Sequence, residues 1–189
     1  MPVYYQFDVR LNRIDPPIRR RFLIARSATF RDLSRAIQDA FGWSGQHLFA
    51  FYGKSSGPTL AGVPSDEMTE PVPDARKVKL ESFFGDGKPA KCTYVYDFGD
   101  EWEHEVKCAG LIRTEERFRR RLLEGKRAGP PEDCGGVNGY ERCVALALGE
   151  PIEDEEEDER AESEELLEWL GGWKPEKFDL KKARKAFDR

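Results

Sequence analysis

Alternation of apolar and polar residues with a period of two predicts a β-hairpin at the start of the chain. Residues 3–11 place five apolar side chains on one side of a strand, namely Val3, Tyr5, Phe7, Val9 and Leu11. After Pro16 and Pro17, residues 18–25 alternate again and are expected to pair with the first strand. Because Arg19, Arg20 and Arg21 would point to both faces, we expect this second strand at an edge of the sheet, where long side chains reach water.

Weaker patterns follow in the middle of the chain. Residues 46–52 are expected to form a strand whose Leu48, Ala50 and Tyr52 face the core. Residues 53–74 are rich in Gly, Pro, Ser and acidic residues without periodicity, which is typical of a long surface loop. Residues 78–84 fit a short strand or a single helical turn equally well, and the charged segment 114–126 is expected to be partly helical.

Four segments have the spacing and caps of helices. The clearest begins after Thr29, which can form a capping box with Asp32, and it ends at Gly42. The caps expected for the other three helices are Asn138, Ser163 and Asp179.

These elements predict an α+β fold with a mostly antiparallel sheet of five or six strands. The helix of the N-terminal half and the C-terminal helices are expected to pack on this sheet. We expect a core domain over residues 1–150, followed over 151–189 by an acidic linker and C-terminal helices that pack on the core. The linker is the run Glu153–Glu159, seven consecutive carboxylates whose repulsion favours an extended, solvated form.

Residues 91–106 are predicted to form a second hairpin with charged residues at its tip. A two-residue loop would place aromatic and acidic side chains on the same face and bury carboxylates. We therefore predict a three-residue loop, 99–101, in which Phe98 pairs with Trp102 and Tyr96 pairs with His104. One face is then aromatic and the other acidic, with Asp97 opposite Glu103.

A candidate ligand site follows from this hairpin and from the loop at 129–140, in which prolines and glycines alternate. We expect the two loops to form a shared polar pocket. Its candidate residues are Tyr96, Asp97, Asp100, Trp102, Glu103, His104, Glu132, Asp133, Gly135 and Gly136. The alternative is that the hairpin belongs to the core and the glycines only start the next helix.

The chemistry of such a pocket has several alternatives. The hairpin carboxylates could hold Mg²⁺, Ca²⁺ or Mn²⁺, which would relieve their repulsion. We favour the simpler expectation that they stay hydrated or pair with arginines, and the sequence assigns no metal ligand and no cofactor. Zinc would have to use His104 and Cys134 with Glu132 or Asp133, in a spacing unlike that of structural zinc sites.

Motifs for catalysis are missing from the sequence. It has no glycine-rich phosphate-binding loop and no recognisable nucleophile with its base. We therefore expect a non-enzymatic binding protein. The alternative is a metal-dependent hydrolase that uses the hairpin carboxylates and His104.

Charge is distributed unevenly along the chain. The total is −5, but residues 150–168 hold twelve acidic residues and one arginine, a balance of −11, so the rest of the chain carries +6. Arginine clusters at 19–21 and 117–121 make nucleic-acid binding an alternative function, although such residues usually form a solvated face. The content of aromatic residues and arginine favours a protein partner instead.

The four cysteines, at 92, 108, 134 and 143, are far apart and form no Cys-x-x-Cys motif. The sequence also contains neither a signal peptide nor a run of about 20 apolar residues that could span a membrane. We therefore expect reduced thiols, a cytoplasmic location and no membrane partner.

Several segments together resemble the plasmid pRiA4b open-reading-frame-three-like family. They include Tyr-Gln-Phe-Asp-Val-Arg-Leu at 5–11, Pro-Pro-Ile-Arg-Arg-Arg-Phe at 16–22, Tyr-Asp-Phe-Gly-Asp-Glu-Trp-Glu-His-Glu at 96–105 and Pro-Pro-Glu-Asp-Cys-Gly-Gly at 130–136. The resemblance covers nearly the whole chain. It implies an α+β fold in a bacterial or archaeal accessory protein, sometimes carried on plasmids and insertion elements. Relatives often have cysteines at the positions of Leu122 and Gly129, so any metal site built from them would be lost here.

Overall fold

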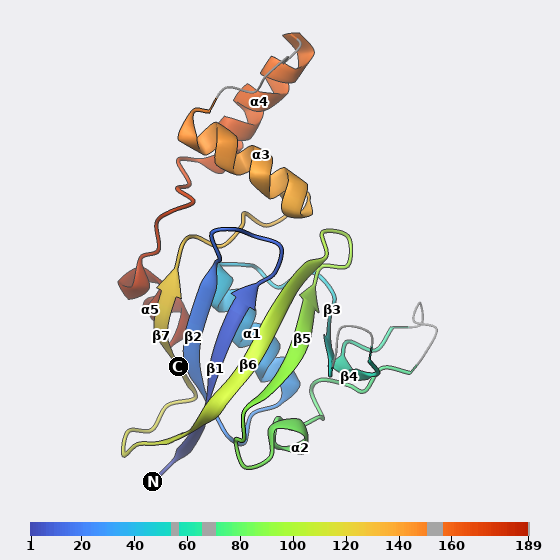
Figure 1. Ribbon diagram of the computed structural model, residues 1–189, viewed down its shortest axis with the longest axis vertical. Coiled ribbons are helices and arrows are strands. Elements are labelled where there is room, and N and C mark those ends of the chain that lie inside the picture. Colours follow the sequence, from blue (N-terminus) through green and yellow to red (C-terminus); the bar gives the residue numbers. More distant parts are fainter. Residues whose placement is uncertain (54–56, 66–70, 151–156, 189) are drawn as a thin grey trace.

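One antiparallel sheet of seven strands forms the centre of the computed structural model, which describes residues 1–53, 57–65, 71–150 and 157–188 (Figure 1). In spatial order the strands are β4 (Thr59–Gly62), β3 (Phe49–Tyr52), β5 (Ala90–Tyr96), β6 (Trp102–Arg113), β1 (Val3–Leu11), β2 (Arg19–Ala25) and β7 (Arg120–Lys126). All neighbouring strands are antiparallel. The sheet has more strands than expected, and together with the helices it confirms the predicted α+β fold.

Strand β7 corrects two predictions. Part of segment 114–126 was expected to be helical, but Arg120–Lys126 pairs with β2 along its length. The hydrogen-bonding edge of β2 supplies this pairing, and the charged sequence of the segment carries no local pattern that predicts it. β2 therefore lies inside the sheet between β1 and β7 and is not an edge strand.

Arg20 is buried as a consequence, with 2% of its surface exposed. Its guanidinium lies 4.9 Å from the centre of the Phe41 ring and 4.0 Å from that of Phe178. It also donates a hydrogen bond of 2.7 Å to the carbonyl oxygen of Ala40, which lies at the C-terminal end of the helix over residues 30–41. Burial lowers the pKa of Arg20 to about 9, and the aromatic faces and carbonyl oxygens stabilise the cation in place of a carboxylate.

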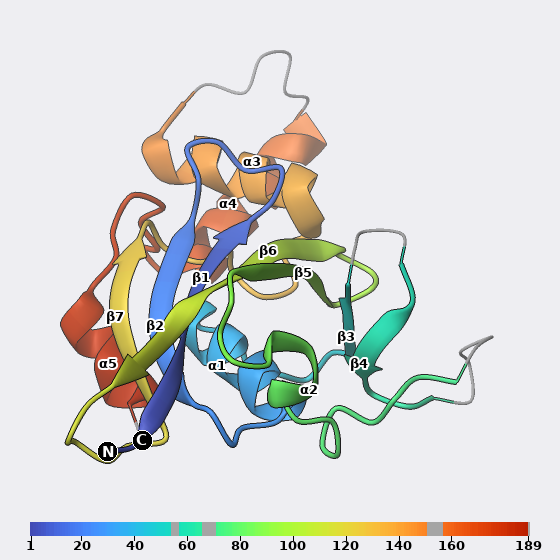
Figure 2. The same ribbon diagram turned by 60° about the horizontal axis from the view of Figure 1, so that its bottom comes forward.

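Strands β3 and β4 lie at the other end of the sheet (Figure 2). The expected strand at 46–52 is present as Phe49–Tyr52, but its faces are the reverse of those predicted, because Phe49 and Phe51 join the core while Leu48 is 39% exposed. Two phenylalanine rings bury more apolar area than the alternative face. β4 forms inside the stretch expected to be a loop, since β3 offers it a free edge.

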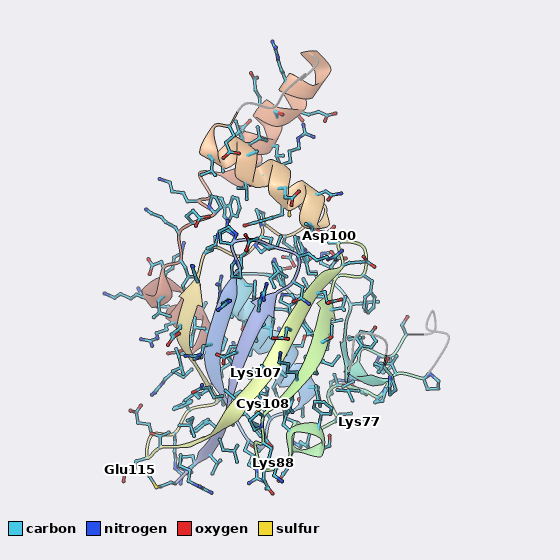
Figure 3. All side chains as sticks on the ribbon, viewed as in Figure 1. Lys77, Lys88, Asp100, Lys107, Cys108 and Glu115 are labelled. Carbon is cyan, nitrogen blue, oxygen red and sulfur yellow. The ribbon has the colours of Figure 1, made fainter. Side chains whose placement is uncertain are left out.

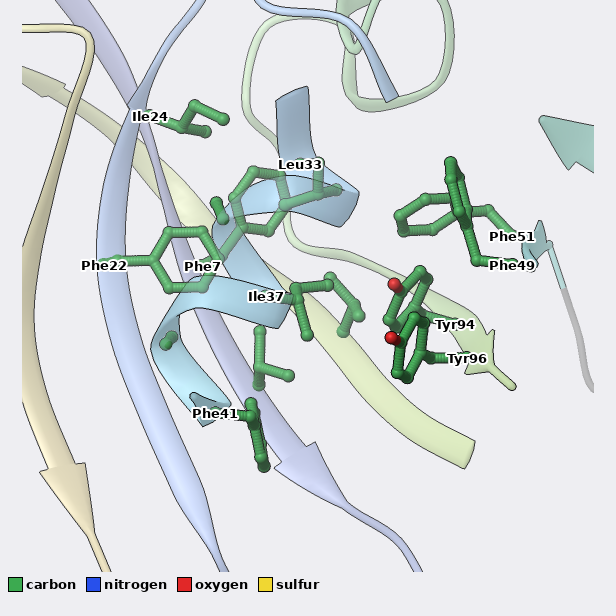
Figure 4. Packing of buried hydrophobic residues seen from close by; sticks show 14 of the residues in the cluster. Phe7, Phe22, Ile24, Leu33, Ile37, Phe41, Phe49, Phe51, Tyr94 and Tyr96 are labelled. Atoms are coloured by element: carbon green, nitrogen blue, oxygen red, sulfur yellow. The ribbon is translucent and has the colours of Figure 1, made fainter. Parts of the chain in front are cut away.

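Helix α1 (Phe30–Phe41) covers the inner face of the sheet (Figure 2). Thr29 and Asp32 form the predicted capping box, and Gly42 ends the helix with a φ of +90°. The helix packs onto aromatic side chains from four strands, which include Phe7, Phe22, Phe49, Phe51, Tyr94 and Tyr96 (Figure 4). Burial of each such ring stabilises the fold by about 1.5–3 kcal/mol.

The remaining helices depart from the predicted caps in two places. Residues 78–84 were expected to form either a short strand or a helical turn, and the structure has a helical turn there, α2 (Glu81–Phe84). Asp179 caps α5 (Leu180–Phe187) as predicted. α3 (Gly136–Leu148) begins two residues before Asn138, after Gly135. In α4 (Glu157–Leu170), Ser163 lies inside the helix. No helix in the described part of the chain has the length and apolar character needed to span a bilayer.

Helix α4 also bears on the expected linker. Residues 157–159 of the acidic run are helical and not extended, whereas residues 153–156 lie outside the described residues. α3 and α4 pack on each other beyond the end of the sheet (Figure 1), and α5 packs on β7 and α1.

The hairpin of β5 and β6 is present, but its predicted register is wrong. Tyr96 pairs with Trp102 and Tyr94 with His104, so five residues, 97–101, form the loop. The loop starts early because the Asp97 carboxylate accepts from the backbone N–H groups of Gly99 (3.0 Å) and Asp100 (3.4 Å). A shift of two residues preserves the faces, so the aromatic side is buried as predicted.

The same shift removes two predicted pairs. Glu103 lies opposite Val95 and not Asp97, and Phe98 is 38% exposed in the loop. The like-charge pair that suggested a cation on the strands therefore does not form there.

His104 is fully buried among aromatic rings, with Phe41 and Trp43 in edge contact at 4.9 and 5.4 Å. Its Nδ1 lies 3.4 Å from the Tyr94 carbonyl oxygen, while its Nε2 has no hydrogen-bond partner in the described structure. Burial lowers the pKa of His104 from 6.5 to about 3. The imidazole is therefore neutral in the folded protein at neutral pH.

This burial predicts a loss of stability in acid. Below pH 6.5 the unfolded chain takes up a proton at His104 that the folded protein rejects down to a pH of about 3. The free energy of unfolding should therefore fall by about 1.4 kcal/mol per pH unit in this window beyond the contribution of other groups. In urea titrations at pH 7 and pH 4.5, a His104→Phe variant should lose less stability than the wild type, and an equal loss in both would contradict this origin.

The packing of α5 predicts a second stability effect. Phe187 is fully buried, and its ring centre lies 5.3 Å from that of Phe22. Its backbone carbonyl accepts a hydrogen bond from the Arg120 side chain at 2.8 Å. Phe187→Ala should therefore lower the free energy of unfolding by about 3–5 kcal/mol. The control Trp169→Ala removes a larger ring that is 52% exposed, and in denaturant titrations it should change stability by less than about 1 kcal/mol. Equal effects of the two variants would show that α5 is not part of the core.

Candidate functional site

Three segments far apart in the sequence meet at one end of the sheet: residues 43–47 after α1, the 97–101 loop and the 130–136 loop. Two hydrogen bonds join the first to the third. Trp43 donates from Nε1 to the carbonyl of Pro130 at 3.0 Å, and the backbone N–H of Ser44 donates to Glu132 at 2.7 Å. Trp43 is itself buried and stacks on Tyr96 with ring centres 5.0 Å apart. The loops are thus fixed to the core.

His47 lies between two of the predicted site residues. Its Nε2 is 2.8 Å from an oxygen of Asp133, and its Nδ1 is 3.5 Å from an oxygen of Asp97. One ligand atom from each of the three residues lies within 4.8 Å of the others. Asp97 is the most enclosed of the three side chains, at 14% exposed, and Asp133 the most open, at 68%. Among the described residues, this is the one group of three or more His, Cys, Asp or Glu residues with such spacing.

The backbone at both carboxylates is left-handed, with a φ of +56° at Asp97 and +61° at Asp133. Few residues other than glycine adopt this region, although aspartate tolerates it better than most. These conformations turn the two side chains toward His47 from opposite loops.

Glu132 anchors the second loop beneath this cluster. It accepts from the hydroxyl of Tyr96 at 2.5 Å and from the backbone of Ser44. Burial opposes the charge of Glu132, but these hydrogen bonds outweigh it and hold its pKa below the usual value. Burial, reinforced by the bond to Glu132, raises the pKa of Tyr96. Glu132 is thus an ionised structural acceptor.

Asp100 connects the hairpin tip to the start of α3 (Figure 3). Its carboxylate accepts a hydrogen bond from the backbone N–H of Gly135 at 3.2 Å. A negative charge at this position is stabilised by the N-terminal end of the helix dipole. Gly136, with a φ of +67°, lies so close that an added Cβ would be 2.8 Å from the Asp100 carbonyl oxygen. A side chain does not fit at this position without movement of the loop.

The structure brings seven of the ten predicted site residues to this junction: Tyr96, Asp97, Asp100, Glu132, Asp133, Gly135 and Gly136. The other three lie elsewhere. Trp102 and His104 are buried in the core. Glu103 is on the opposite face of β6, where it accepts from Asn12 at 2.6 Å. His104 therefore cannot form the zinc site considered with Cys134, since it faces aromatic rings and not the loop.

Sequence reasoning missed His47. It is one of two histidines in the chain, but 50 residues separate it from Asp97 and 86 from Asp133, so no spacing links the three. Because the chain has only two histidines, His47 could have been considered as a candidate site residue. Its partners, however, are known only from the folded structure, where the three segments meet.

The arginine clusters are largely structural. Arg20, Arg120 and Arg127 are buried, and Arg121 pairs with Glu116 at 2.7 Å. Arg120 contacts Asp39, and Arg127 pairs with Glu176 at 2.7 Å. Arg20, Arg120, Arg121 and Arg127 are therefore not available to a phosphate backbone, whereas Arg19, Arg117 and Arg119 are exposed.

These features define an α+β protein with one helix-covered sheet and a polar loop site at one end of that sheet. The chain belongs to the plasmid pRiA4b ORF-3-like protein family, whose model matches residues 3–182. This match confirms the resemblance that the sequence motifs suggested.

Two similar proteins agree with this assignment. An uncharacterized protein of Sinorhizobium fredii is 34% identical over 167 residues, which are 88% of this chain and 80% of that protein. The crystal structure of a protein of unknown function from Methanosarcina mazei Go1 is 32% identical, with a TM-score of 0.77 over 96% of this chain and 98% of that one.

The contact between Gly136 and Asp100 gives a test of how tightly the junction is built. Gly136→Ala should destabilise the protein by roughly 2–4 kcal/mol. It places alanine in the left-handed backbone region and brings its Cβ too close to the carbonyl oxygen of Asp100. Gly149→Ala is the matched control: its φ is +70°, but nothing lies within 4 Å of the added Cβ, so about 1 kcal/mol is expected. Thermal unfolding of both variants measures the difference, and equal losses would show that the loop contact is loose.

Proposed function

We propose that this protein is an accessory binding protein whose loop site holds a divalent transition-metal cation between His47, Asp97 and Asp133. The spacing of these three side chains carries the proposal, since one ligand atom from each of three segments lies within 4.8 Å of the others. The sequence favoured hydrated carboxylates at this place, but that expectation did not include the imidazole.

The ligand set indicates the kind of cation. One imidazole nitrogen and two carboxylate oxygens suit Zn²⁺, Mn²⁺ or Fe²⁺, whereas Mg²⁺ and Ca²⁺ prefer oxygen ligands alone. Three protein ligands leave further positions for water or for a group from a partner. The competing occupant is a proton, which would make His47 an imidazolium ion bridging both carboxylates.

The surroundings of the cluster support a preorganised site. Glu132 does not face the cation but holds the 130–133 segment through Tyr96 and Ser44, as outer hydrogen bonds commonly do around metal ligands. Asp133 is largely exposed, so the site is open to exchange with solvent.

The proposal assigns binding and contains no catalytic step. The alternative hydrolase depended on His104, which is fully buried and therefore out of reach of a substrate. The proposal also includes an accessory role on mobile genetic elements, because the family takes its name from a protein encoded on a plasmid.

Metal content tests the proposal directly. Untagged protein purified without chelator and dialysed against micromolar Zn²⁺ or Mn²⁺ should retain about one ion per chain, measured by plasma mass spectrometry. His47→Ala and Asp97→Asn should each weaken the affinity at least about tenfold, because each removes one of three ligands.

The matched control is Glu81→Gln, which removes a carboxylate that pairs with Arg26 far from the loops. It should bind the metal as the wild type does. If the wild type retains neither metal, or if both ligand variants bind as tightly as the wild type, the proposal fails and His47 is a structural ion-pair partner.

A further inference from the structure

The outer face of the sheet, opposite α1, is not covered by any helix in the described part of the chain (Figure 1). It contains a depression of about 450 Å³ lined by β1, β2, β6 and β7. Lys107 marks the middle of this face in Figure 3. The exposed or half-exposed basic residues that line the depression are Arg10, Arg19, Arg21, Lys107 and Lys126.

Three of these cations lie side by side across three strands. Arg10 is directly opposite Arg19, and Arg19 is directly opposite Lys126. Neighbouring strands are about 4.8 Å apart, and like charges directly opposite each other destabilise a sheet. The fold therefore holds a row of three positive charges at an energetic cost.

The acidic residues of the same face form no ion pair with this row, although Glu105 offsets part of the charge of Arg10. Glu105, opposite Arg10, binds Lys91 at 2.7 Å. Asp8 and Glu124 both bind Arg21, at 2.5 and 3.3 Å.

The row itself is left without partners. Within the described residues, the side chains of Arg10, Arg19 and Lys126 make no hydrogen bond or ion pair, and neither does that of Lys107. Four cations are therefore free to bind an anion from outside the chain.

We propose that this row binds the phosphate backbone of a nucleic acid. Guanidinium groups such as those of Arg10 and Arg19 match phosphate oxygens in geometry as well as charge. The row extends over roughly 10 Å across three strands, which is enough for successive phosphates of one strand and more than a single anion needs.

The lining of the depression sets the kind of recognition. It contains no aromatic residue on which a base could stack, so binding should depend on the backbone and not on base sequence. A membrane surface fits less well, because Val9, the apolar side chain of the lining, is 1% exposed and cannot insert into lipid. This site is independent of the proposed cation site.

The test measures the anisotropy of a fluorescently labelled 20-nucleotide mixed-sequence DNA, single-stranded and as a duplex, with the full chain at 50 and 200 mM salt. Three phosphate contacts predict a loss of roughly 15- to 40-fold in affinity between these salt concentrations. The triple variant Arg10→Gln, Arg19→Gln, Lys126→Gln should bind at least about tenfold more weakly than the wild type at 50 mM salt, with a flatter salt dependence.

The matched control removes the same charge from α5 through Lys181→Gln, Lys182→Gln and Lys185→Gln, all exposed residues. It should bind DNA within about twofold of the wild type. The melting temperature of the row variant should equal or exceed that of the wild type, since the substitutions remove repulsion, and this confirms that it is folded.

Three outcomes would overturn the proposal. These are no binding by the wild type at 50 mM salt, equal weakening in the two triple variants, and equally tight binding of polyglutamate or anionic phosphatidylserine vesicles. Equal weakening would assign the attraction to positive charge anywhere on the surface, and equal binding of the other polyanions would show that the row does not select a phosphate backbone.

Discussion

Burial of one face of the sheet under α1 is the constraint on which the rest of the molecule depends. Side chains in a strand alternate between faces, so each strand that enters the sheet must present its apolar set to the helix. This requirement places Phe49 and Phe51 inside, and it keeps Tyr96 and Trp102 inside even though the hairpin register differs from the expected one. It also leaves the charged side chains of the same strands on the open face.

The loop site uses the core as its support. Trp43 and Tyr96 are buried, yet each has a polar group at its edge that reaches the 130–136 loop. Through these two hydrogen bonds the aromatic core positions Asp133 opposite Asp97, with His47 between them. Many proteins carry their functional groups in loops that a rigid sheet holds in place, because loops tolerate the unusual backbone angles that such groups need.

The two proposed sites differ in charge and in location. The His47 cluster gathers carboxylates in the loops at the end of the sheet, whereas the row from Arg10 to Lys126 lies on its outer face. Both contain like charges held close together by the fold. In each case the neighbouring backbone is fixed by strand pairing or by buried anchors, so the like-charged side chains start from positions close together. A ligand of opposite charge would relieve the repulsion.

Features that depend on neighbouring residues can be predicted from the amino-acid sequence. α1 with its capping box, the Asp179 cap, the first two strands and the inward face of the second hairpin all follow from local spacing. Three features became visible only in the folded chain: β4 and β7 are strands, the hairpin loop begins at Asp97, and His47 meets Asp97 and Asp133. The physical reason is that the pairing of β7 with β2 and the meeting of His47 with Asp97 and Asp133 join residues about 50 to 110 positions apart, which impose no period on the chain. β4 and the start of the hairpin loop depend on nearer partners, namely the free edge of β3 and the turn hydrogen bonds of Asp97, which leave no periodic pattern either.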